Sequence, residues 1–234
     1  MKIKTKTLVG FLKKARMTGT QAITEAVFRF EKDGLKINAN SEPQQARVMA
    51  WLNSGAFQEY EAIGNVGLND LANVVKVLDR FGETIVLKKE GNILNVKSEG
   101  KTVDIELVNE NFLNTDINEP SLTFTDTFDV KADKLHDIIK DVEMNKDAVL
   151  TIKTIEKSVL FTNTGKYKFS NSIEAPTCKG GVKVDYGQPF IDCTSELDGP
   201  LQISVASNYP CKVIERLETS VVTIIIAPRV ESEE

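Results

Sequence analysis

The sequence predicts an α+β fold built by duplication, because a unit of strand, amphipathic helix and hairpin occurs twice. Residues 68–78 and 132–142 carry apolar side chains at i, i+3, i+4 and i+7, which places them on one helical face. The two apolar sets are Leu71, Val74, Val75 and Leu78, and Leu135, Ile138, Ile139 and Val142. Each helix is followed by a β-rich run and a hairpin signal, at 98–101 and at 163–166. Unrelated helices would share only the spacing, so the matching hairpins favour a duplicated βαββ unit.

Composition indicates a soluble globular protein. The chain has 234 residues, which is enough for one large or two ordinary domains, with 41% apolar and 27% charged residues. No run approaches the roughly 20 apolar residues that cross a bilayer. The basic N-terminus lacks the apolar core of a secretory signal, so we expect a cytosolic protein without a membrane partner. With a net charge of −5, any contact with nucleic acid requires positive groups gathered on one surface.

The sequence contains no arrangement of residues typical of catalysis. Cys178, Cys193 and Cys211 are odd in number and widely spaced, which fits neither a disulfide framework nor a zinc site. His136 has no cysteine nearby in sequence, and carboxylate pairs such as Asp133 and Asp137 are common on solvated helix faces. No nucleotide-binding, hydrolase or metalloprotease motif occurs. We therefore expect no enzymatic activity, no metal and no cofactor.

Periodicity and turn residues predict the remaining elements. Asp33-Gly34 joins two alternating strands in a hairpin, and Trp51 in the following strand is expected to be a core residue. Pro189 is acceptable in the first turn of the last helix. Helices are expected at 7–17, 68–78, 132–142 and 188–197. Strands are expected at 28–30, 35–39, 48–52, 62–66, 84–89, 92–97, 101–108, 124–130, 148–153, 158–162, 166–173, 181–187, 201–206, 211–217 and 220–227.

An Asn-rich, acidic stretch that ends in Pro120 interrupts the pattern near the middle of the chain. It predicts an N-terminal domain of residues 1–110, a connector of residues 111–121 and a C-terminal domain of residues 122–234. Phe112, Leu113 and Ile117 are more apolar than a linker requires. They either dock the connector onto a domain or form a binding surface. The acidic tail, 231–234, is expected to be disordered.

Basic side chains gather on the polar faces of two predicted helices. The first helix carries Lys6 and Lys13 opposite its apolar face, with Lys14 and Arg16 on the flanks. The outer face of helix 68–78 is acid-free and consists of Asn69, Asn73, Lys76 and Arg80. A solvated lysine face would explain the first helix alone. On a protein of net negative charge, an acid-free basic stripe is stronger evidence for a functional surface than a basic stripe on a basic protein would be. The outer face of helix 132–142 carries both acidic and basic residues.

Several segments resemble the archaeal and eukaryotic sliding clamps, the proliferating cell nuclear antigen family. They are Thr223-Ile224-Ile225-Ile226-Ala227-Pro228-Arg229-Val230-Glu231, Ser207-Asn208-Tyr209-Pro210-Cys211-Lys212-Val213 and Asp33-Gly34-Leu35-Lys36-Ile37-Asn38-Ala39. The order of both helices also matches, and the Ala-Pro-Arg ending is the most specific element.

This resemblance implies the DNA-clamp fold: two similar domains with helices on one face and antiparallel sheets on the other. It implies a non-enzymatic ring, a homotrimer, that encircles duplex DNA, is opened by a clamp loader and holds a DNA polymerase and repair enzymes. Such a protein lies near the nucleoid if archaeal or from a mobile element, and in the nucleus if eukaryotic. The residues expected to face DNA phosphates are Lys13, Lys14, Arg16, Lys76, Arg80, Lys134 and Lys140.

Two further sites follow from the resemblance. Short client peptides are expected in a pocket beside connector residues 118–121, formed by Asn40, Val48, Leu122, Pro210, Ala227 and Pro228. For Val48 and Ala227, an ordinary core position is the alternative. Subunits are expected to pair through strands 101–108 and 181–187. Asp104 and Glu106 face out from the first, and Lys179 and Lys183 lie in or beside the second.

Three departures from the family pattern leave a second function open. The last helix has no Lys or Arg, Asn40 stands where the family has Met, and two residues are inserted near Gln44-Gln45. These departures favour weaker DNA contact by the second domain and weaker binding of client peptides. The alternative function is a clamp-like adaptor that acts as a monomer, or as one subunit of a mixed ring.

Overall fold

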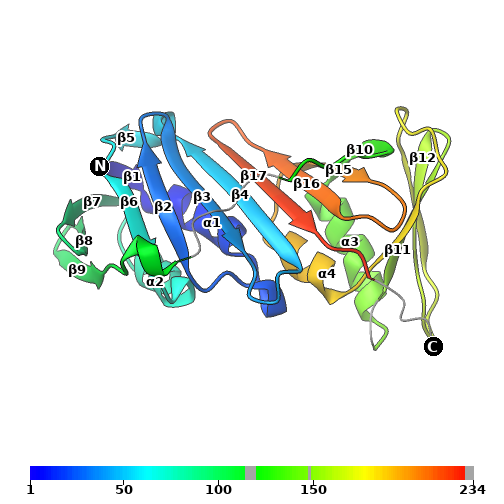
Figure 1. The fold of residues 1–234 in the computed structure, drawn as a ribbon, viewed down its shortest axis with the longest axis horizontal. Helices are drawn as coiled ribbons and strands as arrows, with labels where there is room; N and C mark the ends of the chain where they lie inside the picture. Colours follow the sequence, from blue (N-terminus) through cyan, green and yellow to red (C-terminus); the bar gives the residue numbers. More distant parts are fainter. Residues whose placement is uncertain (114–119, 147–148, 230–234) are drawn as a thin grey trace. The chain divides into compact units, whose positions relative to one another are not determined.

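The computed structural model describes residues 1–113, 120–146 and 149–229, and the chain divides into two compact units (Figure 1). Unit 1 comprises Met1–Met17, Ala22–Asn118 and Glu218–Val222. Unit 2 comprises Thr18–Gln21, Glu119–Leu217 and Thr223–Glu234. Residues 18–21 belong to unit 2 and residues 218–222 to unit 1, although the residues on either side of each segment belong to the other unit. Nothing in the sequence predicts this assignment. Most of the proposed connector, including Ile117 and Asn118, lies outside the described residues, as does tail 231–234.

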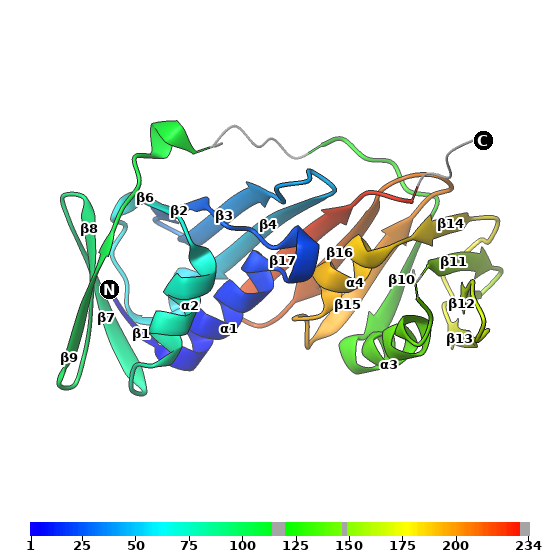
Figure 2. The ribbon, with the colours of Figure 1, turned by 90° about the horizontal axis from the view of Figure 1, so that it is seen from below.

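Unit 1 contains two sheets and two α-helices, which lie side by side beneath β2, β3 and β4 (Figure 2). One sheet has the order β5-β1-β7-β8-β9, and the other has β6-β2-β3-β4 with Ser220–Val222 of β17 next to β4. The elements are β1 (Lys2–Lys4), α1 (Thr5–Arg16), β2 (Ala26–Glu31), β3 (Gly34–Asn40), β4 (Ala46–Asn53), η2 (Ser54–Ala56), β5 (Phe57–Glu59), β6 (Gly64–Leu68), α2 (Leu71–Asp79), β7 (Thr84–Glu90), β8 (Ile93–Ser98), β9 (Lys101–Glu106) and η3 (Glu110–Phe112).

Unit 2 is built in the same manner, with α3 and α4 on one side of β10, β15 and β16 (Figure 2). Its sheets have the orders β13-β12-β11-β14 and β10-β15-β16-β17. The elements are η1 (Gly19–Gln21), β10 (Asp126–Lys131), α3 (Ala132–Glu143), β11 (Leu150–Ile155), β12 (Ser158–Asn163), β13 (Ser170–Glu174), β14 (Lys183–Tyr186), α4 (Gln188–Thr194), β15 (Pro200–Val205), β16 (Cys211–Arg216) and β17 (Ser220–Ile226).

The duplication runs deeper than the sequence indicated, because each unit holds two copies of strand, helix and three-stranded meander. The copies are β1-α1-β2-β3-β4 and β6-α2-β7-β8-β9 in unit 1, and β10-α3-β11-β12-β13 and β14-α4-β15-β16-β17 in unit 2. The first strand of each copy pairs with the meander of the other copy in the same unit: β1 with β7, β6 with β2, β14 with β11 and β10 with β15. Each unit therefore interlocks two motifs.

Local chemistry explains most boundaries. Gly34 closes the β2–β3 hairpin with φ 141°, and a side chain there would lie 2.1 Å from the carbonyl oxygen of Leu52. The carboxylate of Asp70 accepts a hydrogen bond from the backbone N–H of Asn73 and caps α2. The predicted apolar faces of α2 and α3 are buried. The described residues contain no helix long and apolar enough to span a membrane.

Two predictions about strands are wrong. Trp51 is half-buried and lies between the buried Ala50 and Leu52 of β4, so it belongs to the opposite, outer face of the sheet. β13 begins at Ser170 rather than at 166, because the preceding loop is held by side chains instead of a strand partner. The short strands β1 and β5 were not predicted, since three residues are too few to show an alternation.

Candidate nucleic-acid and partner interfaces

Helices α1 and α2 pack against each other and bring most of the predicted basic residues of unit 1 together. Lys76 is exposed on α2, and Arg80 is exposed at the C-cap of that helix. The Lys13 ammonium lies 3.3 Å from the Asp79 carboxylate, across the two helices. Asp79 therefore offsets the charge of Lys13. Lys76 and Arg80 are the most available cations of this surface, which we call the α1–α2 face.

Lys14 and Arg16 are less available than predicted. Lys14 is only 6% exposed, so the structure does not support it as a DNA-facing residue. Arg16 is half-buried and lines an apolar crevice between the helices with Leu12 and Val75. Its Nε atom is buried without a hydrogen-bond partner among the described residues. Basic residues that are close together in the sequence thus point in different directions around α1 and differ in how much they are buried.

In unit 2, Lys134 and Lys140 are both exposed on α3. Lys140 lies 3.0 Å from the carboxylate of Asp137, one turn away on the same helix. The pair is widely exposed, so water screens the attraction and leaves it weak. The surface of α3 is mixed in charge, as predicted.

Helix α4 presents no Lys or Arg and is devoted to structural contacts. The Asp192 carboxylate is buried and accepts hydrogen bonds from the N–H and hydroxyl of Thr20, both at 2.8 Å. The Nε2 atom of His136 on α3 lies 3.1 Å from the carbonyl oxygen of Thr194. His136 therefore joins α3 to α4.

Four of the predicted pocket residues belong to unit 2, and three of them gather at one end of its sheet. Pro210 precedes β16 and Ala227 and Pro228 follow β17, the neighbouring strand; all three are half-buried. The half-buried Leu122 lies two residues before Phe124, whose ring packs edge-to-face against Tyr209 at a centroid distance of 6.2 Å. Phe124 and Tyr209 were not predicted. Residues 121, 123 and 125 are exposed, whereas Leu122 and Phe124 between them are half-buried, and only the structure shows this difference.

The remaining two pocket residues belong to unit 1 and differ in exposure. Asn40 is half-buried, and its side-chain oxygen accepts a 2.8 Å hydrogen bond from Nε of Arg47. Val48 is 0% exposed. The prediction that Val48 forms a wall of an open pocket is therefore wrong, and the alternative interpretation as a core residue is right.

Replacing Val48 with Asp should unfold unit 1 rather than block a partner. An unpaired carboxylate in this core costs several kcal/mol, about 3 or more. We expect a urea midpoint far below that of the parent chain and a loss of near-ultraviolet circular dichroism. Val48→Ala, which adds only a small cavity, should retain the fold. A Val48→Asp chain with parental stability would contradict the burial of this residue.

Strands β9 and β14 both lie at the edge of a sheet, but their outer edges differ. β9 exposes Asp104 and Glu106, and the residues that precede each of them, Val103 and Ile105, are half-buried. Along β14, the N–H of Lys183 donates to Ser207 Oγ at 3.3 Å, and the carbonyl of Asp185 accepts from the Arg229 N–H at 2.8 Å. The structure therefore does not support strand 181–187 as the second pairing edge. Lys179 and Lys183 are exposed beside this occupied edge.

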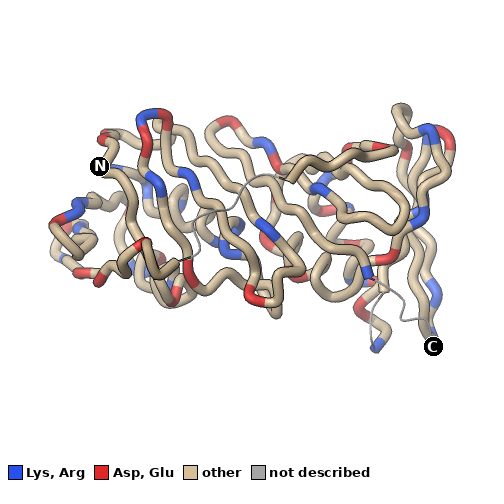
Figure 3. The backbone as a smooth tube through the Cα atoms, in the orientation of Figure 1, with Lys and Arg blue, Asp and Glu red and all other residues tan. Residues whose placement is uncertain are grey.

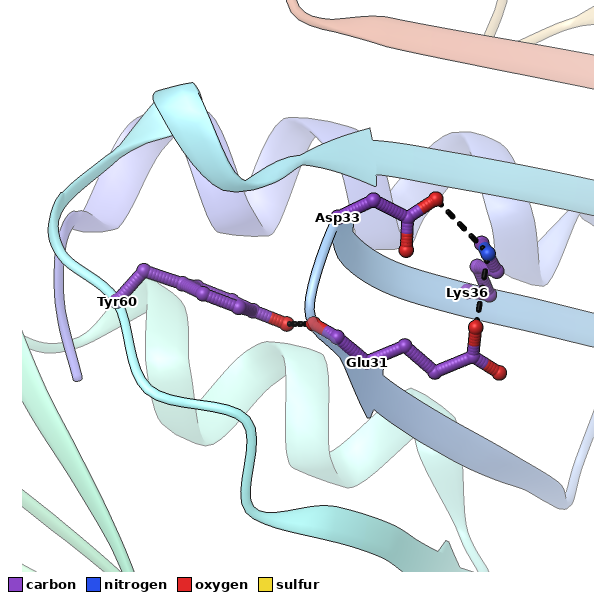
Figure 4. Close-up of polar contacts among 4 residues, drawn as sticks. All are labelled: Glu31, Asp33, Lys36 and Tyr60. Carbon is purple, nitrogen blue, oxygen red and sulfur yellow. Dashed lines mark hydrogen bonds and ion pairs between the residues drawn. The ribbon is translucent and has the colours of Figure 1, made fainter.

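Polar clusters elsewhere in the described residues are structural. Both charge signs meet at the β2–β3 turn (Figure 3), where Lys36 lies 2.8 Å from Glu31 and 2.9 Å from Asp33. The Tyr60 hydroxyl donates a 2.6 Å hydrogen bond to the carbonyl oxygen of Glu31 (Figure 4). Burial raises the pKa of Tyr60 to about 12, so it remains a donor at neutral pH.

The three described cysteines do not have the properties of activated nucleophiles. Burial raises the pKa of the Cys211 thiol to about 12, and burial likewise raises the pKa values of Cys178 and Cys193. All three thiols are therefore protonated and unreactive at neutral pH. The described residues hold no cluster of three or more side chains suited to a metal ion.

Relatives in sequence are sliding clamps. No family model matches the chain. A protein of Methanococcus maripaludis strain C7 named DNA polymerase sliding clamp is 23% identical over 241 residues, 94% of this chain and 96% of that protein. A protein of the same name from Pyrococcus furiosus is 28% identical over 140 residues, 56% of this chain and 55% of that protein.

Solved structures of proliferating cell nuclear antigen (PCNA) have the same fold. The structure of the C-terminal region of FEN-1 bound to A. fulgidus PCNA superposes with a TM-score of 0.86 at 16% identity, covering 99% of this chain and 98% of that one. PCNA of Entamoeba histolytica gives 0.82 at 18% identity, with 98% of each chain covered. The PCNA2–PCNA3 complex of Sulfolobus tokodaii gives 0.78 at 18% identity, with 98% and 99% covered. The chain is therefore a divergent relative of the archaeal sliding clamps and has the fold of the PCNA family.

Proposed function

We propose that this protein is a non-enzymatic DNA sliding clamp, which encircles duplex DNA and holds a polymerase and other enzymes on it. The observation that carries the proposal is the α1–α2 face, where Lys76 and Arg80 stand exposed on a chain with a net charge of −5. Contacts by such a face are to phosphates, which position a protein without reading sequence. Sliding requires this lack of sequence preference. The sequence relatives named DNA polymerase sliding clamp support the proposal.

Ring closure requires pairing between copies, and the repeated topology selects the strands. β9 in unit 1 and β13 in unit 2 are each the third strand of a meander, and each ends a sheet in the described residues. We infer that β9 of one copy pairs with β13 of the next, head to tail, and that three copies close a ring. β13 thus replaces strand 181–187 as the proposed partner of β9.

Client proteins are proposed to bind unit 2 where Leu122, Pro210, Ala227 and Pro228 lie. Half-buried apolar residues beside the Phe124–Tyr209 pair form a surface on which an aromatic side chain of a peptide can pack. The PCNA structure with bound FEN-1 peptide supports this mode of recruitment. A clamp loader is proposed as a further partner, since a closed ring must be opened to reach DNA.

A mixed ring is the second candidate. The Sulfolobus tokodaii structure is a complex of PCNA2 with PCNA3, two different clamp chains, and has the same fold. In such an assembly this chain would supply one of several non-identical subunits. By itself it would be a clamp-like adaptor that does not encircle DNA.

Light scattering of the purified chain at micromolar concentration distinguishes these functions. A mass three times the 25.9 kDa of one chain is expected for the homotrimer. A single-chain mass across the concentration range would overturn the homotrimer and leave the adaptor or mixed-ring function. A filter-retention assay on circular and linear duplexes then tests encirclement, because a ring slides off free ends but stays on a closed circle.

A further inference from the structure

Two lysines of unit 2 lie directly opposite each other on neighbouring strands. β11 and β14 are antiparallel, and their register pairs Lys153 with Lys183. Both lysines are exposed, whereas the residues on either side of each are buried, so both side chains stand on the outer face of the sheet. Like charges that face each other across two strands are destabilising. Neither ammonium forms an ion pair in the part of the chain that the structure describes. We call Lys153 and Lys183 the lysine pair.

The nearest acid on the same two strands is engaged elsewhere. Asp185 follows Lys183 by two residues on the same face of β14, and its carboxylate accepts a 2.5 Å hydrogen bond from the hydroxyl of Thr151, the residue directly opposite it. On the other side of Lys153, the residue opposite it in β12 is the apolar Leu160. The lysine pair is therefore open to an anion from another part of the chain or from a partner.

The last described residue lies against the same strand. The backbone N–H of Arg229 donates a 2.8 Å hydrogen bond to the carbonyl oxygen of Asp185, at the edge of β14. Arg229 is exposed and is itself a cation. The sequence continues with residues 230–234, which contain three acids, Glu231, Glu233 and Glu234, and no base. Acidic side chains thus begin two residues after a backbone position that is fixed beside the lysine pair.

We propose that the acidic tail, residues 231–234, binds the lysine pair of its own copy and competes there with acidic segments of client proteins. The length of the tail is sufficient for this contact, because five extended residues span about 17 Å. Lys183 lies two residues from Asp185 along β14, about 7 Å, and Lys153 lies one strand further, about 5 Å away. The charges of the tail and of the lysine pair are opposite.

The covalent connection makes weak contacts sufficient. Exposed ion pairs are individually weak and are screened by salt. A short tether nevertheless gives the tail an effective concentration on the order of millimolar at the lysine pair. An acidic segment of another protein must then displace the tail. Ala227 and Pro228 of the proposed client surface directly precede Arg229. The competition with clients therefore rests on the proposed function, whereas the binding of the tail does not.

Carbodiimide cross-linking of the full chain tests the binding of the tail, because it joins an amine to a carboxylate only when the two groups meet. We expect an amide between Lys153 or Lys183 and a tail glutamate, detected by mass spectrometry. Its yield should fall several-fold between about 50 mM and about 500 mM salt, as screening increases. In a mixture of isotope-labelled and unlabelled chains, the cross-linked residues should carry the same label, since both belong to one copy.

A hexaglutamate peptide tests the competition. Replacing the three tail glutamates with glutamine should increase the affinity for this peptide about fivefold or more, because the tethered competitor is removed. Adding Lys153→Gln with Lys183→Gln should cancel the gain. Adding Lys131→Gln with Lys146→Gln instead, two exposed lysines of unit 2 outside β11 and β14, is the matched control at the same net charge and should retain it. Fluorescence anisotropy of labelled peptide measures all four proteins.

Other results overturn the inference in distinguishable ways. Cross-links only between differently labelled chains would place the tail on another copy, and absence of cross-links to the lysine pair would exclude tail binding. Unchanged peptide affinity of the tail variant would remove the competition. Loss of DNA retention by the Lys153 and Lys183 variant, without cross-links in the parent, would assign the pair to nucleic acid. Failure of the clamp function appears separately, as a single-chain mass in light scattering with the cross-links intact.

Discussion

Reversing Lys76 and Arg80 together to glutamate should abolish retention of the protein on closed circular DNA and remove its stimulation of the polymerase. Both side chains are exposed on α2 and belong to the polar face of an otherwise well-packed helix. The double reversal changes the local charge by four units and places acids where phosphates pass. Each lost phosphate contact should lower the slope of log affinity against log salt by about 0.9. Retention, processivity and salt slope are measured on the same protein preparation.

A matched control tests whether the effect comes from this surface or only from the change in the net charge of the protein. Lys88→Glu with Lys97→Glu makes the same change in net charge on exposed positions of β7 and β8. This variant should keep retention and processivity close to those of the parent. Circular dichroism and thermal unfolding of both variants should also match the parent. Unchanged processivity of the α2 variant at physiological salt would show that its basic face is an ordinary solvated surface.

Replacing Ala227 with Asp should abolish binding of client peptides while the protein stays folded and assembled. Ala227 is half-buried at the end of β17, so an added carboxylate projects at the surface rather than into the core. An aromatic peptide anchor packed beside Phe124 and Tyr209 would lose its apolar contact there. Loss of one hot-spot contact costs about 2 kcal/mol or more, which is about thirtyfold in the dissociation constant. Calorimetry with the C-terminal peptide of the polymerase from the same organism measures it.

Ala62→Asp provides the control, because Ala62 is exposed in unit 1 and lies in the loop before β6. It should bind the peptide with parental affinity. The light-scattering mass of both variants should equal that of the parent. Normal peptide affinity of the Ala227 variant would place the client site elsewhere on the chain.

The sequence by itself determined the elements whose period or turn chemistry is strong. Four helices were predicted where α1, α2, α3 and α4 occur, and the Asp33-Gly34 turn joins β2 and β3 as expected. These features are local, since a few neighbouring residues decide the backbone conformation and the buried face.

Tertiary structure decided which residues of those elements reach solvent. Lys13 and Lys14 are adjacent in sequence, yet Lys14 is buried whereas Lys13 reaches Asp79 of the neighbouring helix α2. In β4, Val48 is buried and its neighbour Met49 is half-buried. The alternation in the sequence shows that the two side chains face opposite sides of the sheet, but it does not show which side is covered.

Whether the outer edge of a strand is free to pair was also decided by the tertiary structure. The resemblance implied 101–108 and 181–187 as pairing edges. Both β9 and β14 end a sheet, but Ser207 and Arg229 come from distant positions to occupy the outer side of β14. β13 was predicted as an ordinary strand, although its place in the repeated topology matches that of β9. Propensity and periodicity report how a segment folds. Only the assembled chain shows which backbone groups and side chains have already found partners, and that decides which surfaces remain for DNA, clients and other subunits.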